Sequence, residues 1–180
     1  MVLISPLFYC PCFIIQISFL PTFLCLEVIC KILEVVLMTL SGVQAERDLV
    51  HLFWDAGFAV LRAPASGGGT LLPRPDLIAG SQKRQKFFVL EIKTARKDSI
   101  YISEEQINGL LEFASRLGFE AFLGVKFKKR RSGFLFLAVP DELERVKNST
   151  NFKVTFAHAS QKGRTFGELI GEYKQKRLLE

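Results

Sequence analysis

The run FFVLEIK (residues 87–93) is the most strand-like stretch of the chain, and it follows a shorter run, PDLIA (residues 75–79). Both runs predict β-strands, because apolar and β-branched residues cluster there between turn-forming segments. Side chains two positions apart on a strand point to the same face of the sheet. We therefore expect Glu91 and Lys93 to point together, while Ile92 points into the core.

Asp76 adds a second carboxylate, separated from Glu91 by fourteen residues. If the two strands pair, Asp76 comes to lie beside Glu91. Converging carboxylates repel each other unless a cation neutralises them, and oxygen ligands suit Mg²⁺ or Mn²⁺. Lys93 could then hold an attacking hydroxide or stabilise negative charge on a phosphate. The pattern favours metal-dependent hydrolysis of a phosphodiester, although charges alternating at a strand end are also common on solvated faces.

The composition divides the chain into two parts. The length of 180 residues fits one domain. The net charge of +6 combines −1 in residues 1–40 with +7 in residues 41–180. All four cysteines lie in residues 1–40, and His51 and His158 are the only histidines. A disulfide scaffold and a cysteine- or histidine-rich metal site are therefore excluded in the body. Its basic balance favours polyanionic partners such as nucleic acid, although solubility alone could explain it.

Residues 1–40 are strongly apolar and allow three interpretations: a membrane anchor, a secretory signal, or translation assigned from too early a start. Repeated prolines interrupt a membrane helix, and no basic residue precedes Lys31. We expect residues 1–40 to be an apolar extension outside the native domain, with Met38 as the true start and residues 41–180 as the functional domain. Membrane association is not expected, and the cysteines are interpreted as ordinary apolar residues.

The body reads as a mixed α/β domain with a central sheet. Ser41 is the expected cap of the first helix, and SEEQ (residues 103–106) predicts a capping box in which the glutamine reaches back to the serine. The expected helices cover residues 43–56, 103–117, 140–147 and a terminal stretch from Thr165. The expected strands cover residues 58–62, 75–79, 87–93, 119–127, 133–139 and 152–156.

Three further features have two interpretations each. Glu46 either complements the N-terminus of the first helix or supplies a third carboxylate to the metal. Ser66, followed by three glycines, belongs either to a flexible loop or to one that approaches a phosphate. The basic run of Lys128, Lys129, Arg130 and Arg131 is either a solvated hairpin tip or a phosphate contact.

A wider set of residues matches a known family in order along the chain. The matching segments are QAER (44–47), GFAVLRAPASG (57–67), PDLIA (75–79), EIK (91–93), YI (101–102), EQ (105–106) and LEFA (111–114). With these segments the chain resembles the archaeal-type Holliday junction resolvases of the restriction-endonuclease-like PD-(D/E)xK superfamily. The resemblance implies an α/β restriction-endonuclease-like fold, with a mixed central β-sheet flanked by helices.

The resemblance also implies a function. Members of this family are metal-dependent endonucleases that act in recombination and repair. They bind four-way DNA junctions as homodimers and nick two opposed strands symmetrically. Glu46, Asp76 and Glu91 match the acidic metal-site residues, and Lys93 matches the catalytic lysine. Ser66 matches a loop serine implicated in catalysis. Arg47 and Arg62 match basic residues near the DNA. The family's dimer surface lies around the helix at residues 103–117, so Phe113 and Leu117 are candidate contacts, although Phe113 could instead be a core residue.

The resemblance thus implies an enzyme that uses Mg²⁺, with Mn²⁺ as the second candidate ion, in the cytoplasm in association with the nucleoid. One alternative is another nuclease of this fold that acts on non-junction DNA. A degenerate DNA-binding module is a further alternative, but every catalytic position is filled. A membrane-tethered protein would depend wholly on residues 1–40.

Overall fold

The computed structural model describes residues 42–63 and 72–172. The chain divides into residues 1–37 and 38–180, and all of the described residues belong to the second unit. The expectations for residues 1–40, for the Ser41 cap and for Ser66 lie outside the described residues. Within the two described ranges, no helix is both long and apolar enough to cross a membrane.

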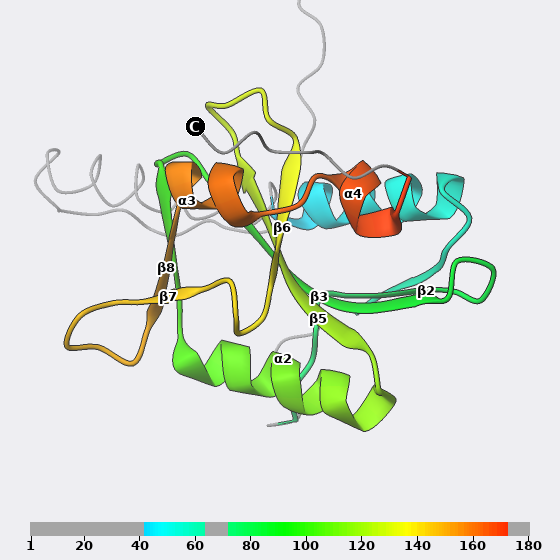
Figure 1. Cartoon of the computed structure of the whole chain (residues 1–180), viewed down its shortest axis with the longest axis horizontal. Helices are drawn as coiled ribbons and strands as arrows, with labels where there is room; N and C mark the ends of the chain where they lie inside the picture. Colours follow the sequence, from blue (N-terminus) through cyan, green and yellow to red (C-terminus); the bar gives the residue numbers. More distant parts are fainter. Residues whose placement is uncertain (1–41, 64–71, 173–180) are drawn as a thin grey trace, which may run out of the picture. The chain divides into compact units, whose positions relative to one another are not determined.

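A five-stranded mixed sheet forms the centre of the domain (Figure 1), in the order β1-β2-β3-β5-β6. Its strands are β1 (Ala59–Arg62), β2 (Leu77–Ser81), β3 (Lys86–Ala95), β5 (Glu120–Phe127) and β6 (Phe134–Ala138). The neighbours β3 and β5 are parallel, and the other three pairs are antiparallel. The expected mixed central sheet is confirmed.

A second, three-stranded sheet was not expected. It consists of β4 (Ser99–Ile102), β8 (Phe152–Thr155) and β7 (Glu144–Arg145), in that order. The expected helix over residues 140–147 is wrong, because Glu144 and Arg145 pair with β8. A backbone hydrogen bond from the Val146 N–H to the Asn151 carbonyl holds this hairpin together.

Both long helices end where the sequence indicates. The first helix covers residues 42–55, and Gly57 follows it with a φ of 82°. The helix α2 (Glu104–Leu117) begins after Ser103, whose side chain accepts a hydrogen bond from a backbone N–H, and ends at Gly118 with a φ of 68°. Glycine adopts this left-handed conformation without the steric cost that other residues bear, so it ends both helices cleanly.

Two short helices complete the described chain. The helix α3 (Phe156–Lys162) was not expected and is capped by the Thr155 side chain. The helix α4 (Phe166–Ile170) begins after Thr165 as expected, with a full capping box. It has only five residues, because Gly171 adopts a left-handed conformation directly after it.

Two apolar clusters cover the two faces of the central sheet. The first helix and α4 pack on one face, and α2 packs on the other, as Figure 1 shows. The cluster under the first helix includes Ala45, Leu49, Phe53, Phe88, Leu90, Ile92 and Leu169. The cluster under α2 includes Ile107, Leu110, Ala114, Val89, Leu123, Val125 and Leu137.

Candidate active site

The strand β3 presents different residues to the two layers of helices. Phe88, Leu90 and Ile92 belong to the cluster under the first helix, whereas Val89 belongs to the cluster under α2. By strand alternation, Glu91 and Lys93 lie on the same face as Val89. The expectation that Glu91 and Lys93 point together while Ile92 is buried is confirmed, and the charged pair lies on the α2 face.

Asp76 directly precedes β2 and reaches β3 through a side-chain hydrogen bond. The antiparallel register pairs Leu77 with Leu90, so the next position along places Asp76 opposite Glu91. The Ile92 N–H donates to Asp76 Oδ2 at 2.7 Å. The carboxylate therefore takes the place of a backbone acceptor at the end of the strand pair. The expected approach of Asp76 to Glu91 is confirmed.

The surroundings of Asp76 raise its pKa from 3.8 to about 6. Burial contributes most because it disfavours the charged carboxylate, and the negative charge of Glu91 contributes next. The hydrogen bond from the Ile92 N–H and the charge of Lys93 act in the opposite direction, and Glu46 raises the pKa further. Asp76 therefore lies in the combined field of two other carboxylates, an environment that a bound cation would relieve.

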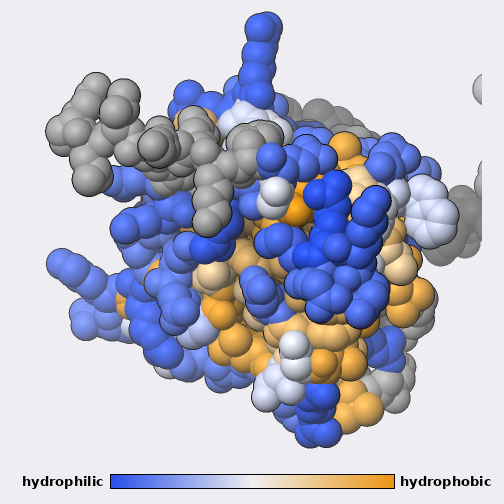
Figure 2. Space-filling view, turned by 45° about the vertical axis from the view of Figure 1, so that its right-hand side comes forward, coloured by the Kyte–Doolittle hydropathy of each residue, from blue (hydrophilic) through white to orange (hydrophobic). Residues whose placement is uncertain are grey.

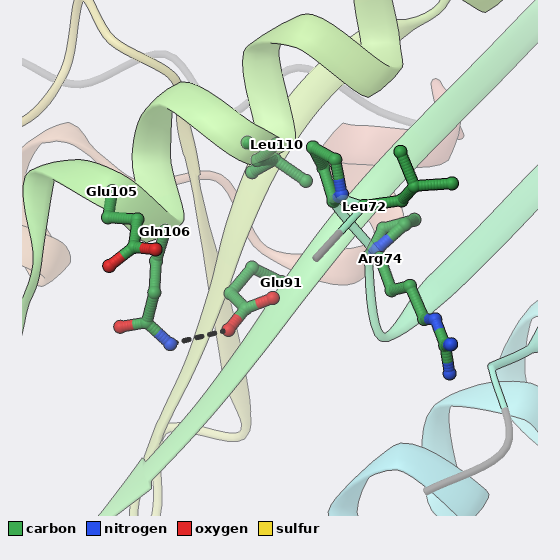
Figure 3. Close-up of a pocket in the computed structure, with 9 residues that line it drawn as sticks. Leu72, Arg74, Glu91, Glu105, Gln106 and Leu110 are labelled. Atoms are coloured by element: carbon green, nitrogen blue, oxygen red, sulfur yellow. Dashed lines mark hydrogen bonds between the residues drawn. The ribbon is translucent and has the colours of Figure 1, made fainter. Parts of the chain in front are cut away.

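Glu91 is 9% exposed, and one of its carboxylate oxygens contacts two polar side chains, one in an ion pair and one in a hydrogen bond. Lys93 Nζ lies 2.7 Å from Glu91 Oε1, and Gln106 Nε2 donates to the same oxygen at 3.3 Å. Lys93 comes from the same strand, whereas Gln106 comes from the first turn of α2. Figure 3 shows the amide of Gln106 reaching down from the helix to Glu91.

Gln106 is the site residue that the sequence interpretation missed. The capping-box prediction is half correct: Ser103 Oγ accepts a hydrogen bond from the Gln106 backbone N–H at 3.3 Å. The side chain of Gln106 does not return to the backbone of Ser103; its amide contacts the Ser103 hydroxyl and Glu91. Because Glu91 points to the α2 face, a polar residue in the first turn of that helix was the available signal.

Glu46 lies on the first helix, which covers the opposite face of the sheet. Its carboxylate accepts a hydrogen bond from Arg62 Nε at 2.7 Å, across the space between the helix and β1. Its charge reaches Asp76, but the part of the chain that the structure describes contains no cluster of three or more metal-ligating side chains placed to hold an ion. The structure therefore brings Asp76, Glu91 and Lys93 together and keeps Glu46 with Arg62.

The donor chemistry of this group fits a hard divalent cation. Asp76 and Glu91 provide carboxylate oxygens, and the burial and repulsion that raise the pKa of Asp76 are the conditions that a bound cation would relieve. Among the described residues, Glu91 Oε2 receives no hydrogen bond, since both donors use Oε1. This oxygen is thus available to a ligand.

A cavity of about 380 Å³ opens beside Glu91. It lies between residues 72–75 and the N-terminal half of α2, and it is lined by Leu72, Pro73, Arg74, Pro75, Glu91, Glu105, Gln106, Gly109 and Leu110. In Figure 3, the Arg74 side chain extends away from Glu91 toward the first helix. The cavity gives the polar end of β3 access to solvent on the α2 side.

The predicted DNA-contacting residues differ in their surroundings. Arg47 is exposed on the first helix, whereas Arg62 is half-buried and paired with Glu46. Lys128, Lys129 and Arg131 are exposed in the β5–β6 loop. Partial desolvation lowers the pKa of Lys128, and the positive charges of Arg96 and Lys126 lower it further.

Arg130 differs from its neighbours in the same loop. It binds Asp98 through two nitrogens, at 3.2 and 2.8 Å, and its guanidinium lies over the Phe156 ring. Arg130 therefore remains exposed, but Asp98 and Phe156 hold its side chain against the protein surface.

The two residues matched to a dimer surface lie near the end of α2. Phe113 is half-buried against the apolar cluster under the helix, and Leu117 is 43% exposed. Apolar side chains also reach the surface in the lower part of the face turned forward in Figure 2, below a mostly polar region. Among the large apolar residues exposed on the described chain are Leu61, Leu72 and Leu117.

Comparisons with known proteins point to one family. The model of the archaeal Holliday junction resolvase (Hjc) family matches residues 38–178. A crossover junction endodeoxyribonuclease Hjc from Archaeoglobus fulgidus is 30% identical over 143 residues, covering 79% of this chain and 98% of the relative. The protein of the same name from Sulfolobus acidocaldarius is 38% identical over 131 residues, covering 72% of this chain and 86% of the relative.

The fold comparison gives the same result. A solved structure of Hjc from Archaeoglobus fulgidus, described as a Holliday junction resolvase, superposes with a TM-score of 0.63 at 30% identity. The match covers 75% of this chain and 99% of the solved one. The chain belongs to the archaeal Holliday junction resolvase family.

Proposed function

We propose that this protein is a structure-specific endonuclease that resolves four-way DNA junctions in homologous recombination and repair. The observation that carries the proposal is the convergence of Asp76, Glu91 and Lys93 at the polar end of β3. This convergence occurs in a chain that matches junction-resolving relatives along most of its body. The relatives supply the substrate class, and the site supplies groups that can hydrolyse a phosphodiester.

The family implies dependence on a divalent metal, and we propose Mg²⁺, with Mn²⁺ as a substitute. The ion would neutralise charge on the scissile phosphate and lower the pKa of a bound water. Asp76 and Glu91 would hold it, and Glu46 is proposed as a third ligand. Since Glu46 is paired with Arg62 in the described structure, this role would require its carboxylate to leave the arginine.

Lys93 is proposed as the catalytic lysine. Its ammonium is held 2.7 Å from Glu91, so its position is fixed before substrate arrives. An ammonium at this place can stabilise the charge that develops on the phosphate in the transition state. Ser66 is proposed as a further catalytic residue, from the family resemblance of its loop. Water attacks the phosphorus, and the bond from phosphorus to the 3′ oxygen breaks. This leaves a 3′-hydroxyl and a 5′-phosphate, the ligatable nick expected of a resolvase.

The proposed DNA contacts are electrostatic. Arg47, Lys128, Lys129 and Arg131 are exposed cations that can approach phosphates. Arg62 and Arg130 are proposed with them, although each is paired with a carboxylate of the protein. Phosphate contacts fix the position of DNA but read no sequence. Specificity would therefore come from the shape of the junction, and the enzyme would act in the cytoplasm at the nucleoid.

We further propose a homodimer. A four-way junction has near two-fold symmetry, and a two-fold dimer presents two identical sites to it. The exposed Leu117 and the half-buried Phe113 on α2 are the proposed contacts.

A supercoiled plasmid with an extruded cruciform tests this mode of action. Two coordinated nicks across the junction linearise the plasmid, whereas independent nicks first accumulate nicked circles. We expect the full-length protein with Mg²⁺ to give linear plasmid as the main early product, and light scattering to give the mass of a dimer. Nicked circles as the main product, or a monomeric mass, would contradict paired cutting by a dimer.

A further inference from the structure

Gln106 connects the start of α2 to the proposed catalytic pair. Its Nε2 lies 3.3 Å from Glu91 Oε1, the oxygen that also contacts Lys93 Nζ at 2.7 Å. The two donors approach Glu91 from different elements, one from β3 itself and one from the helix above it. A carboxylate oxygen that is contacted from two elements has less freedom to move than one held by a flexible lysine alone.

The chemistry of the contacts fixes which way the amide of Gln106 faces. An ionised carboxylate only accepts hydrogen bonds, so the nitrogen of the amide must point to Glu91. The amide oxygen then faces the Ser103 hydroxyl, which lies 3.4 Å away and can donate to it. The same hydroxyl accepts from the Gln106 backbone N–H and caps α2. The helix cap thus orients the amide, and the amide in turn orients Glu91.

We propose that Gln106 is a positioning residue for the nuclease reaction, which prepares Glu91 for the metal ion. Together with Lys93 it occupies Oε1 of Glu91 and directs Oε2, which receives no hydrogen bond from the described residues, to the cation. The role rests on the proposed function, because it gives Glu91 its task in metal-dependent cleavage. Residues that orient metal ligands typically change metal affinity or activity 10–100-fold when they are removed.

The role also requires that the side chain at position 106 carries no charge. The site already contains two carboxylates, because Asp76 lies opposite Glu91 on the paired strand and accepts a hydrogen bond from the Ile92 N–H. A carboxylate at position 106 would have the same size as the amide but would add a further negative charge and remove the donor. It would repel Glu91 rather than hold it.

The experiment uses the full-length protein in three forms: Gln106→Ala, Gln106→Glu and the control Asn108→Ala. Asn108 is an exposed amide two positions further along α2, so its removal tests any general effect on the helix. Calorimetry measures Mn²⁺ binding to the metal-free protein without DNA. Single-turnover cleavage of a four-way junction and junction binding in EDTA are measured on the same preparations.

We expect Gln106→Ala to weaken Mn²⁺ binding, or to slow cleavage at a fixed limiting Mn²⁺ concentration, by about 10–100-fold. Gln106→Glu should lose more activity than Gln106→Ala because it adds repulsion. Junction binding in EDTA should stay within about twofold of wild type for both, and Asn108→Ala should match wild type throughout. Either variant can decide the question if the other fails to fold.

Two results would overturn the role of Gln106. One is wild-type Mn²⁺ affinity and cleavage in Gln106→Ala or in Gln106→Glu. The other is an equal loss in Asn108→Ala, which would mark a general effect of the helix. Failure of the proposed function would look different, since the wild-type protein would then not cleave the junction at all.

Discussion

The two faces of β3 differ in a way that separates stability from chemistry. On one face, Phe88, Leu90 and Ile92 are buried along the strand against the first helix. The other face carries the buried Val89 and becomes polar at Glu91 and Lys93, beside the start of α2. Consecutive residues of one strand therefore serve different purposes, and the apolar face can hold the strand rigid while the other carries charge.

This difference between the faces predicts that substitutions at neighbouring positions of β3 have two different effects. Changes on the apolar face should reduce the free energy of unfolding and leave the reaction intact while the protein is folded. Changes on the polar face should reduce the reaction and leave the fold intact. An apolar-face variant that is folded but inactive, or a polar-face variant that unfolds, would contradict this prediction.

The largest effect is expected for Glu91→Gln. Removing its charge from the metal site should reduce junction cleavage by at least about a thousandfold, equivalent to several kcal/mol of transition-state stabilisation. Junction binding should be retained or improved, because a negative charge near DNA is removed. The control Glu112→Gln changes an exposed carboxylate on α2 and should cleave normally. A loss of binding as severe as the loss of cleavage would refute the role of Glu91.

Lys93→Ala is expected to slow the chemical step by about 10²–10³-fold, as for the loss of one transition-state donor. The affinity for Mn²⁺ should change little, because the loss of the contact that Lys93 makes with Glu91 is offset by the removal of a positive charge that repels the ion. Single-turnover rates at saturating metal measure this step directly. Lys97→Ala, which removes an exposed lysine from the turn after β3, is the control. A wild-type rate in Lys93→Ala would make Lys93 a surface charge only.

On the opposite face, Leu90→Ala should cost about 2–5 kcal/mol of the free energy of unfolding. Leu90 is fully buried, and truncation removes apolar contacts and leaves a cavity. Denaturant unfolding measures this loss, and Leu90→Met, which conserves volume, should cost less than about 1.5 kcal/mol. Cleavage by Leu90→Ala at a temperature where it remains folded should stay close to wild type. A folded variant that cannot cleave would contradict the separation of the two faces.

Asp76→Asn tests whether the charged site reduces the free energy of unfolding of the metal-free protein. The pKa of Asp76 is raised from 3.8 to about 6 in the folded protein. Between these pH values the native state binds more protons than the unfolded state, so this group lowers stability as pH rises through that window. Above pH 6 the full cost applies, at most about 3 kcal/mol.

Without divalent metal, Asp76→Asn should therefore be more stable than wild type at pH 7, and the gain should disappear near pH 3.5. Thermal unfolding across this pH range measures the difference. Added Mg²⁺ should stabilise the wild-type protein more than Asp76→Asn, because the ion relieves the repulsion at Asp76. A less stable Asp76→Asn at pH 7 in metal-free buffer would contradict the assigned cause.

The features that the sequence predicted correctly depend on local rules. The alternation along residues 87–93 determined which side chains of β3 share a face. The glycines at positions 57 and 118 ended the two long helices because each adopts a positive φ there. Asp76 came to lie opposite Glu91 because two adjacent strands pair in an antiparallel register.

The features that were missed depend on contacts between distant segments. The two-residue strand β7 exists only because β8 pairs with it, so a helix over residues 140–147 was a reasonable but wrong prediction. Glu46 bonds Arg62, a partner that the tertiary structure alone provides. Gln106 was interpreted through its local capping role, which concealed its contact with Glu91, fifteen positions away.

The central claim is that the polar end of β3 cleaves four-way junctions, and one assay tests it most directly. Full-length protein with Mg²⁺ is offered a four-way junction and a linear duplex of the same sequence, with each strand labelled in turn, beside Glu91→Gln. We predict symmetric nicks in two opposed strands of the junction, little cleavage of the duplex, and no cleavage by the variant. Equal cleavage of junction and duplex would leave a nuclease without the resolvase function, and undiminished cleavage by Glu91→Gln would place the chemistry elsewhere.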